Sequence, residues 1–268
     1  MRRLYVLGTG HAMVTRLYNS SFALEEGGRF FLLDAGGGNG VLQAMEAMGI
    51  PVCALDHMFL SHTHTDHILG GIWVVRAVGH AIAEGTYQGV FTIWGHRELI
   101  AAFEQICRLV LAPGMTEQLG KRILLRAVEH GARYGSAFGQ LEFFDTGCVQ
   151  VRQFGCSIHF HDGRRLAYLG DDPIRPCAVP WIQGCDTLIS EALCLESERE
   201  LHHPEKSFHS SVAETCRNAQ ALGVKTLILC HTEDTHGAAR KRLYTGEGAR
   251  YFHGTLLVPD DREILTLE

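Results

Sequence analysis

The chain has 268 residues, 46% of them hydrophobic, and its 24 basic and 30 acidic side chains give a net charge of −6. This length and composition allow one large domain or two tightly fused halves with a sizeable core. The acidic balance weighs against a nucleic-acid binder, which usually carries a basic footprint. Nine cysteines without a CxxC pair indicate reduced thiols rather than a disulfide framework or a thiolate zinc site.

The N-terminal segment MRRLYVLGTGHA does not have the pattern of a signal peptide, because glycines and a histidine interrupt its apolar run. No other segment approaches the roughly 18 uncharged apolar residues that a membrane span needs. We therefore expect a cytoplasmic protein without a membrane partner.

Short β-rich apolar runs alternate with helical patterns along the chain. The predicted strands cover residues 4–8, 30–34, 57–61, 90–94, 166–171, 187–192 and 226–231. A glycine-rich turn at residues 36–40 precedes a helical period at Val41, Leu42, Met45 and Met48. The alternation predicts an α/β protein with helices covering sheets.

Several predicted strands end in a polar or ionisable residue. These residues are Asp34, Ser61 followed by His62, Asp171, Glu191 and His231. Ligand sites in α/β sheets lie beyond the carboxyl ends of strands. We therefore expect these residues to converge.

The segment FLSHTHTDHILGG, residues 59–71, holds four potential metal ligands within six positions. They are His62, His64, Asp66 and His67. Imidazoles and a carboxylate suit zinc, iron or manganese, and the absence of thiolates in the segment argues against a purely structural zinc site. On a loop between a strand and a helix, alternate residues point the same way, so the first two would share one metal and the last two a second.

The apolar run after this loop, residues 68–78, predicts a core helix in which Gly70 and Gly71 allow close packing. Other histidines are less telling. His11 lines a pocket or has no role, and His202 and His203 belong to a flap or lie in solvent.

The motif resembles the His-x-His-x-Asp-His signature of the metallo-β-lactamase superfamily, and the likeness extends over nearly the whole chain. LGTGHAMVTRLYNSS (residues 7–21) is similar to the opening of the ribonuclease Z branch. YLGDD (168–172) resembles the Gly-Asp segment, and LISEAL (188–193) the segment that ends in Glu-Ala-Thr. Residues 208–232 resemble the His-Ser-Thr helix and the last metal histidine.

The resemblance implies an αββα sandwich of the metallo-β-lactamase type, as a single domain over residues 1–268. It implies two zinc ions, with manganese or iron as alternatives. One ion would take His62, His64 and Asp171. The other would take Asp66, His67, Asp171 and His231.

Metal-bound hydroxide is nucleophilic near neutral pH, so this site predicts hydrolysis without a covalent intermediate. The residues implied for catalysis are Asp66, His209 and Glu191. Glu191 would orient His209, which would then bind a phosphate oxygen or protonate the leaving group.

The chain differs from the branch at the third metal segment, a strand some twenty residues before the Gly-Asp segment. The branch has a metal-binding histidine there, and this chain has Gln153. Because glutamine is a poor zinc ligand beside imidazole, we expect a weaker first site, completed by water or by another residue. The candidates are Asp145, His130, His159 and His161. A single-metal enzyme built on the second site remains an alternative.

The interval from Gln153 to Asp171 is only long enough for a hairpin, so the arm with which ribonuclease Z binds precursor tRNA is missing. We predict a metal-dependent hydrolase of a small anionic ester or phosphodiester, with RNA a less favoured substrate. The alternatives are ribonuclease Z-type tRNA 3′ processing and a non-hydrolytic metal-binding or sensing protein. Relatives of this branch are often homodimers, which makes a homodimer the expected assembly.

Overall fold

The computed structural model describes residues 1–267 and divides into two compact units, each described here by itself. The first unit comprises Met1–Gly8, Tyr18–Val128 and Asp261–Glu268. The second comprises Thr9–Leu17 and Glu129–Asp260. Each unit holds one seven-stranded mixed sheet with helices packed on it.

The sheet of the first unit has the strand order β14-β1-β2-β3-β4-β5-β6. Its strands are β1 (Arg2–Gly8), β2 (Ser21–Glu26), β3 (Arg29–Leu33), β4 (Leu55–Phe59), β5 (Phe91–His96), β6 (Ile123–Val128) and β14 (Ile264–Leu267). The strands from β14 to β3 pair antiparallel, and those from β3 to β6 pair parallel. The parallel half requires crossover connections, and these carry the unit's helices.

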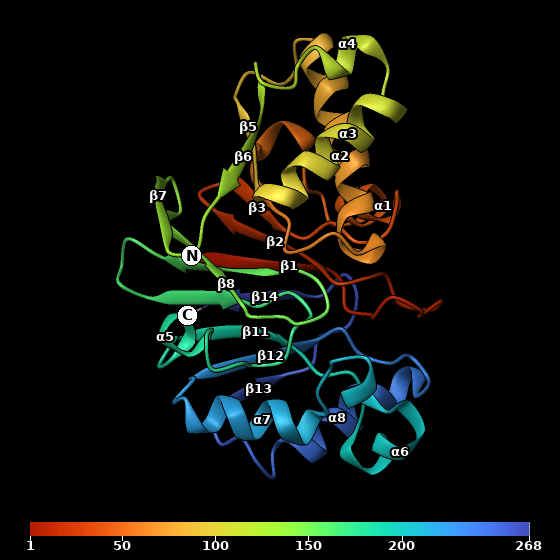
Figure 1. The fold of residues 1–268 in the computed structure, drawn as a ribbon, viewed down its shortest axis with the longest axis vertical. Coiled ribbons are helices and arrows are strands. Elements are labelled where there is room, and N and C mark those ends of the chain that lie inside the picture. The colour runs from red at the N-terminus through yellow and green to blue at the C-terminus, as the bar shows by residue number, and fades with distance from the viewer. Residues whose placement is uncertain (268) are drawn as a thin grey trace. The chain divides into compact units, whose positions relative to one another are not determined.

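The helices of this unit lie together on one side of the sheet (Figure 1). They are α1 (Gly40–Ala47), α2 (Thr65–Ala83), α3 (Arg97–Val110) and α4 (Pro113–Thr116), with a 3₁₀ turn η1 (Val52–Ala54). A Cβ on Gly70 would lie 1.8 Å from the carbonyl oxygen of Ala35, and one on Gly71 would lie 3.0 Å from the Phe103 ring. Both glycines therefore let α2 pack closely, as the sequence predicts.

The sheet of the second unit has the order β13-β12-β11-β10-β9-β8-β7. Its strands are β7 (Ala132–Ser136), β8 (Gly139–Asp145), β9 (Phe154–His159), β10 (Arg165–Tyr168), β11 (Thr187–Glu191), β12 (Thr226–Cys230) and β13 (Thr255–Leu257). The strands from β10 to β13 are parallel, so their carboxyl ends share one edge.

The second unit has short helices except for α7 and α8, which pack beside its parallel strands (Figure 1). The elements are α5 (Val179–Ile182), α6 (Arg199–His202), α7 (Val212–Ala221), α8 (Arg240–Gly248), η2 (Glu196–Glu198), η3 (Pro204–Lys206) and η4 (Gly237–Ala239). Ser211 and Glu214 form a reciprocal capping box at the start of α7. This cap fixes the segment that carries His209.

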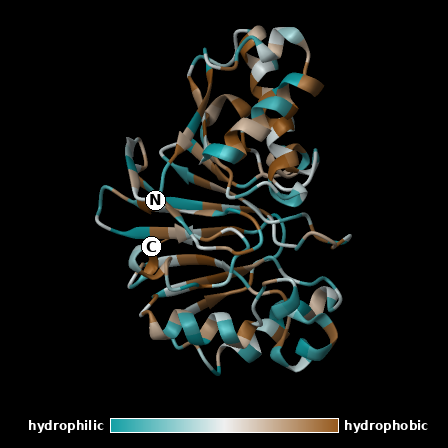
Figure 2. Cartoon of the chain, viewed as in Figure 1, coloured by the Kyte–Doolittle hydropathy of each residue, from teal (hydrophilic) through white to brown (hydrophobic). Residues whose placement is uncertain are grey.

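Hydrophobic residues run along the central strands of both sheets, and the helices also carry hydrophilic residues (Figure 2). All seven predicted strands are present within two or three residues of the expected bounds. No helix in the described part of the chain is both long and apolar enough to cross a membrane.

Candidate metal centre

The histidine-rich segment forms the loop between β4 and the first turn of α2. His62 and His67 are fully buried and Asp66 is nearly so. The ring centroid of His62 lies 4.6 Å from that of His64 and 4.3 Å from that of His67. The Nε2 atom of His67 lies 3.2 Å from a carboxylate oxygen of Asp66. Within this unit, the four predicted ligands thus come together.

Asp34, at the end of β3, orients this cluster. Its Oδ2 atom lies 2.7 Å from Nδ1 of His67, and its two oxygens accept the backbone N–H and the hydroxyl of Ser61 at 2.7 and 2.6 Å. The Ser61 oxygen lies 3.0 Å from Nδ1 of His62. Because the serine proton goes to Asp34, Nδ1 of His62 must donate to the serine oxygen. Both imidazoles therefore carry their proton on Nδ1, which leaves a lone pair on each Nε2.

This tautomer pattern is the one that metal-binding histidines adopt, with the far ring N–H held by a carboxylate or a hydroxyl. It also places a lone pair of His67 and a carboxylate oxygen of Asp66 3.2 Å apart. Two electron-rich atoms at this distance are stabilised by a cation between them. The donor set therefore fits a divalent metal ion such as zinc.

The glycine turn after Asp34 packs directly against the motif. A Cβ on Gly37 would lie 3.5 Å from the Cα atom of Asp66. The hydroxyl of Tyr18 lies 2.8 Å from the carbonyl oxygen of Gly38, and burial raises the pKa of Tyr18 to about 12, so it stays a donor. A Cβ on Gly36, which has φ +69°, would lie 2.4 Å from the Tyr18 ring. The turn thus needs glycine for both space and conformation.

In the second unit, Asp171 and His231 follow the ends of β10 and β12. A carboxylate oxygen of Asp171 lies 3.5 Å from Nε2 of His231, and both residues are buried. The His209 ring centroid lies 5.0 Å from that of His231, and Nδ1 of His209 lies 3.1 Å from the carbonyl oxygen of Asp171. These three predicted residues therefore meet at one edge of the second sheet.

Glu191, at the end of β11, is fully buried, and this burial raises its pKa well above the ordinary value. One carboxylate oxygen accepts the backbone N–H of Ser210 at 2.7 Å, and the other lies 3.7 Å from Nδ1 of His209. The hydroxyl of Thr215 donates to the Glu191 carbonyl oxygen. Glu191 thus holds the segment next to His209 by accepting the backbone N–H of Ser210. The distance from Glu191 to the His209 imidazole is longer than a hydrogen bond.

Gln153 precedes β9 and is almost fully buried. Its amide nitrogen donates to the carbonyl oxygen of Leu169 at 2.7 Å, two residues before Asp171. Its Oε1 atom is buried and accepts no hydrogen bond from the residues that the structure describes. A buried acceptor in this state is costly unless a ligand or an ion satisfies it.

The four other candidates for the third metal segment have different surroundings. One oxygen of Asp145 accepts a backbone N–H two residues further on, and the other lies 3.4 Å from an arginine nitrogen. The ring of His130 accepts the backbone N–H of Asp145 at 3.1 Å. His159 lies 2.9 Å from a carboxylate oxygen of Glu142, and His161 is exposed.

Two histidines left open by the sequence meet at Glu233. The same carboxylate oxygen lies 3.1 Å from Nε2 of His11 and 3.2 Å from Nδ1 of His202. The His11 hydrogen bond is the main cause that lowers the pKa of Glu233. Of the two alternatives for His202, solvent exposure does not hold, because its side chain is only 13% exposed. Because Glu233 follows His231 by two residues, this carboxylate connects the loop at His11 and the end of α6 to the segment after β12 within the second unit.

Comparisons with known proteins agree over nearly the full chain. The family model described as anti-Pycsar protein Apyc1 matches residues 2–242. A ribonuclease Z from Methanothermobacter thermautotrophicus is 28% identical over 100% of this chain and 97% of its own. The metallo-β-lactamase fold protein YhfI from Bacillus subtilis has a TM-score of 0.78 at 20% identity, covering 98% of both chains. Human tRNase Z, short form (ELAC1), has a TM-score of 0.74 at 17% identity, covering 99% of both chains.

The structural likenesses confirm the predicted α/β fold of the metallo-β-lactamase type. The sequence relatives confirm the resemblance to the ribonuclease Z-like branch and the prediction of a metal-dependent hydrolase.

Proposed function

The chain belongs to the family described as anti-Pycsar protein Apyc1, and on this premise we propose that it hydrolyses a phosphodiester or a related ester in a metal-dependent reaction. One observation carries the proposal. In the first turn of α2, Nε2 of His67 and a carboxylate oxygen of Asp66 lie 3.2 Å apart, and Asp34 holds the imidazole from its other side. This is a built set of donors for a divalent cation.

The proposed ligand assignment follows the match to the superfamily, residue by residue. By this match, one zinc ion would be held by His62, His64 and Asp171. The other would be held by Asp66, His67, Asp171 and His231. The first ion would have fewer imidazoles than the branch usually supplies and would be the more weakly bound of the two. Asp145 is left out, because both of its carboxylate oxygens already have partners within the second unit.

When bound, the two cations supply a water whose pKa is lowered to about 7. Asp34 keeps His67 in the correct tautomer for binding. Nδ1 of His209 donates to the carbonyl oxygen of Asp171, so Nε2 is the atom that remains for a substrate oxygen. In the imidazolium form Nε2 also carries a proton, and His209 then donates a hydrogen bond to the phosphate or passes this proton to the departing alkoxide, which leaves the neutral imidazole. Glu191 keeps the His209 segment in place.

A small anionic substrate is favoured over RNA for two reasons. The net charge of −6 gives the protein no general attraction for a polyanion. The interval before Asp171 is occupied by the hairpin of β9 and β10, which leaves no room for an RNA-binding arm. Precursor tRNA cleavage is the alternative, supported by the identity to ribonuclease Z.

The test is hydrolysis of bis(4-nitrophenyl) phosphate by the zinc-loaded protein and by Asp66→Asn. Loss of a carboxylate ligand should lower kcat/KM at least about 100-fold, because even residues that only orient a metal ligand cost 10- to 100-fold. Asp162→Asn, in an exposed turn, serves as the matched control and should keep the native rate. Equal rates for Asp66→Asn and the native protein would exclude the proposed role. Absence of turnover in a protein that binds zinc would favour a sensing protein.

A further inference from the structure

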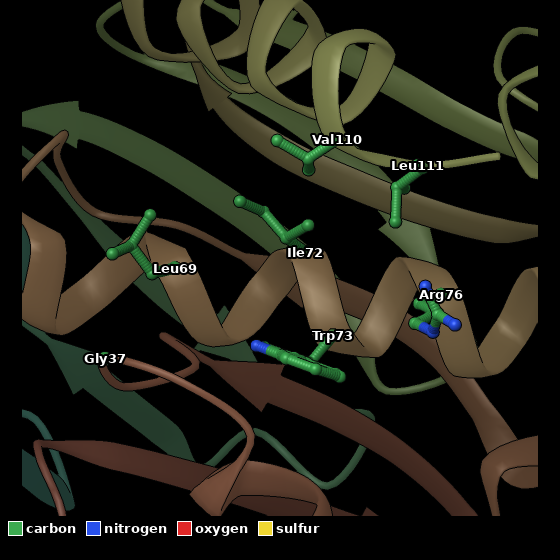
Figure 3. A pocket seen from close by; sticks show the side chains of 7 residues that line it. All are labelled: Gly37, Leu69, Ile72, Trp73, Arg76, Val110 and Leu111. Atoms are coloured by element: carbon green, nitrogen blue, oxygen red, sulfur yellow. The ribbon is translucent and has the colours of Figure 1, made fainter.

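The surface cavity on α2 contains none of the candidate metal ligands. Leu69, Ile72, Trp73 and Arg76 line it from α2, and Val110 lines it from the end of α3 (Figure 3). The described residues that form its walls include one charged side chain and no histidine or carboxylate. A different group of polar side chains, around the short helix α6 of the second unit, bears directly on the proposed reaction.

Two imidazole–carboxylate pairs connect α6 to the segment after β12. Nε2 of His236 lies 2.8 Å from a carboxylate oxygen of Glu198, and Nδ1 of His202 lies 3.2 Å from one of Glu233. Glu198 directly precedes α6 and His202 ends it, so their spacing of four residues places them on one face of the turn. Glu233 and His236 are three residues apart in the other segment. Each segment therefore supplies one acid and one imidazole, and we refer to these four residues as the α6 clamp.

The α6 clamp is largely shielded from solvent, because its four side chains are only 13% to 23% exposed. An imidazole that donates its ring proton attracts a carboxylate, and the attraction is stronger where less water screens it. Arg199 of the same turn also lies 2.8 Å from Glu214 of α7, but its side chain is 36% exposed. Exposed ion pairs contribute little to stability. The α6 clamp is therefore the more shielded of these links between α6 and the rest of the second unit.

The α6 clamp is connected to His209 through one carbonyl group. The backbone N–H of His209 donates to the carbonyl oxygen of Pro204 at 2.8 Å, and Pro204 lies two residues beyond His202. On the other flank of His209, the carboxylate of Glu191 accepts the backbone N–H of Ser210. The backbone at His209 is thus held from both sides, by Glu191 after it and by the end of α6 before it.

Two residues with positive φ lie within this connection. His203 and Phe208 have φ of +45° and +65°, a conformation that persists in residues with side chains only where the surroundings enforce it. His203 lies between His202 and Pro204, and Phe208 directly precedes His209. Loosening the α6 clamp removes part of what enforces these conformations, so the imidazole of His209 would move.

We propose that Glu198 and His236 are positioning residues for His209 and act through the turn of α6. The inference rests on the proposed hydrolysis, in which His209 contacts the substrate, and adds the groups that hold this histidine in place. Glu233 follows the proposed ligand His231 by two residues, so the pair of Glu198 and His236 is the better one to change. Because a misplacement of about 1 Å can cost on the order of 100-fold in rate, loss of this partly exposed pair should cost about tenfold.

The first test asks whether Glu198 acts through His209. In the zinc-loaded protein, Glu198→Ala and His236→Ala should each lower kcat/KM for bis(4-nitrophenyl) phosphate about tenfold, and the double variant should lose no more than either alone. In a His209→Ala background, Glu198→Ala should change the rate less than about twofold, because the group that it positions is absent. Glu200→Ala removes an exposed carboxylate of the same turn and should keep the native rate. An equal loss with and without His209 would overturn the inference, because a merely structural role lowers both rates alike.

Hydrogen exchange separates this inference from the hydrolysis itself. In the folded protein, with or without zinc, the backbone amide of His209 should exchange at least about tenfold faster in Glu198→Ala and His236→Ala than in Glu200→Ala, because its acceptor on Pro204 is no longer held. Glu198→Gln keeps the size of the side chain and replaces Glu198→Ala if that variant does not fold. Absence of turnover in the native protein would overturn the proposed function, and the exchange rates would still decide the role of the α6 clamp. Native exchange at His209 in both variants would overturn the inference and leave the hydrolysis in place.

Discussion

The two units supply the proposed metal ligands in different ways. The first unit offers four donors from one short segment, which ends the loop after β4 and begins α2, and a single carboxylate, Asp34, fixes the imidazole of His67. The second unit brings the proposed ligands Asp171 and His231, and the positioning residue Glu191, from the ends of three neighbouring parallel strands. The first half is therefore built by local sequence, and the second by the topology of a sheet.

The halves share one backbone feature. Asp34 and His231 both follow a strand and both have positive φ, +52° and +53°. Residues with side chains rarely adopt this conformation, which costs on the order of 1 kcal/mol or more and persists where the surroundings enforce it. In each unit, a residue with positive φ directly after a strand carries a buried polar side chain of the cluster. This residue is Asp34 in the first unit and His231 in the second.

The largest expected effect comes from removing one histidine from each half. His67→Ala and His231→Ala should each lower kcat/KM by at least about 100-fold and release zinc, because each removes a direct ligand. Metal analysis after gel filtration measures the loss. His80→Ala, on the exposed face of the same helix as His67, is the matched control. A variant of either half that keeps its zinc would show that this half does not bind metal.

A smaller effect is expected when the orienting carboxylate of the first half is changed. Asp34→Asn keeps the size of the side chain but removes its negative charge. The amide then no longer offers the charged oxygen to which Nδ1–H of His67 donates. Zinc affinity should fall about 10- to 100-fold, measured by competition with a chelating dye. Native affinity in a folded variant would mean that Asp34 serves only the packing of the strand end.

The smallest of these effects concerns Gln153, where the chain departs from its branch. Gln153→His should strengthen the weaker zinc site by about tenfold, because imidazole is a better zinc ligand than an amide oxygen. Calorimetric titration with zinc should resolve the two sites. Gln150→His, an exposed position in the same loop, controls for zinc bound by any added histidine. A first site that is already tight in the native protein, and unaffected by the change, would contradict the assignment.

The sequence predicts the parts of this molecule that depend on local pattern. The seven apolar runs form strands, and the motif at residues 62–67 forms one buried cluster. The roles of Asp34 and Glu233 were missed, because their partners lie far away in sequence or in another loop. Asp34 and His67 are 33 residues apart, and only a parallel strand pair brings them together. The signal in the sequence was an aspartate at a strand end, directly before a glycine turn.

Surface properties were harder to predict for the same reason. The run at residues 68–78 correctly indicated a core helix, but the pattern did not reveal that Trp73 and Arg76 line a cavity. That cavity exists because the end of α3 comes beside α2, a contact that no periodicity encodes. His202 shows the reverse case, since this polar residue at the end of α6 is largely buried and lies 3.2 Å from a carboxylate oxygen of Glu233.

Removal and return of the metal tests the central claim most directly. Protein treated with a chelator and then dialysed should lose turnover of bis(4-nitrophenyl) phosphate at least about 100-fold, and stepwise addition of zinc should restore it in proportion to the zinc bound. The restored rate should depend on Asp66 and His231 alike. Undiminished turnover by protein shown to be free of metal would contradict a metal-dependent hydrolase.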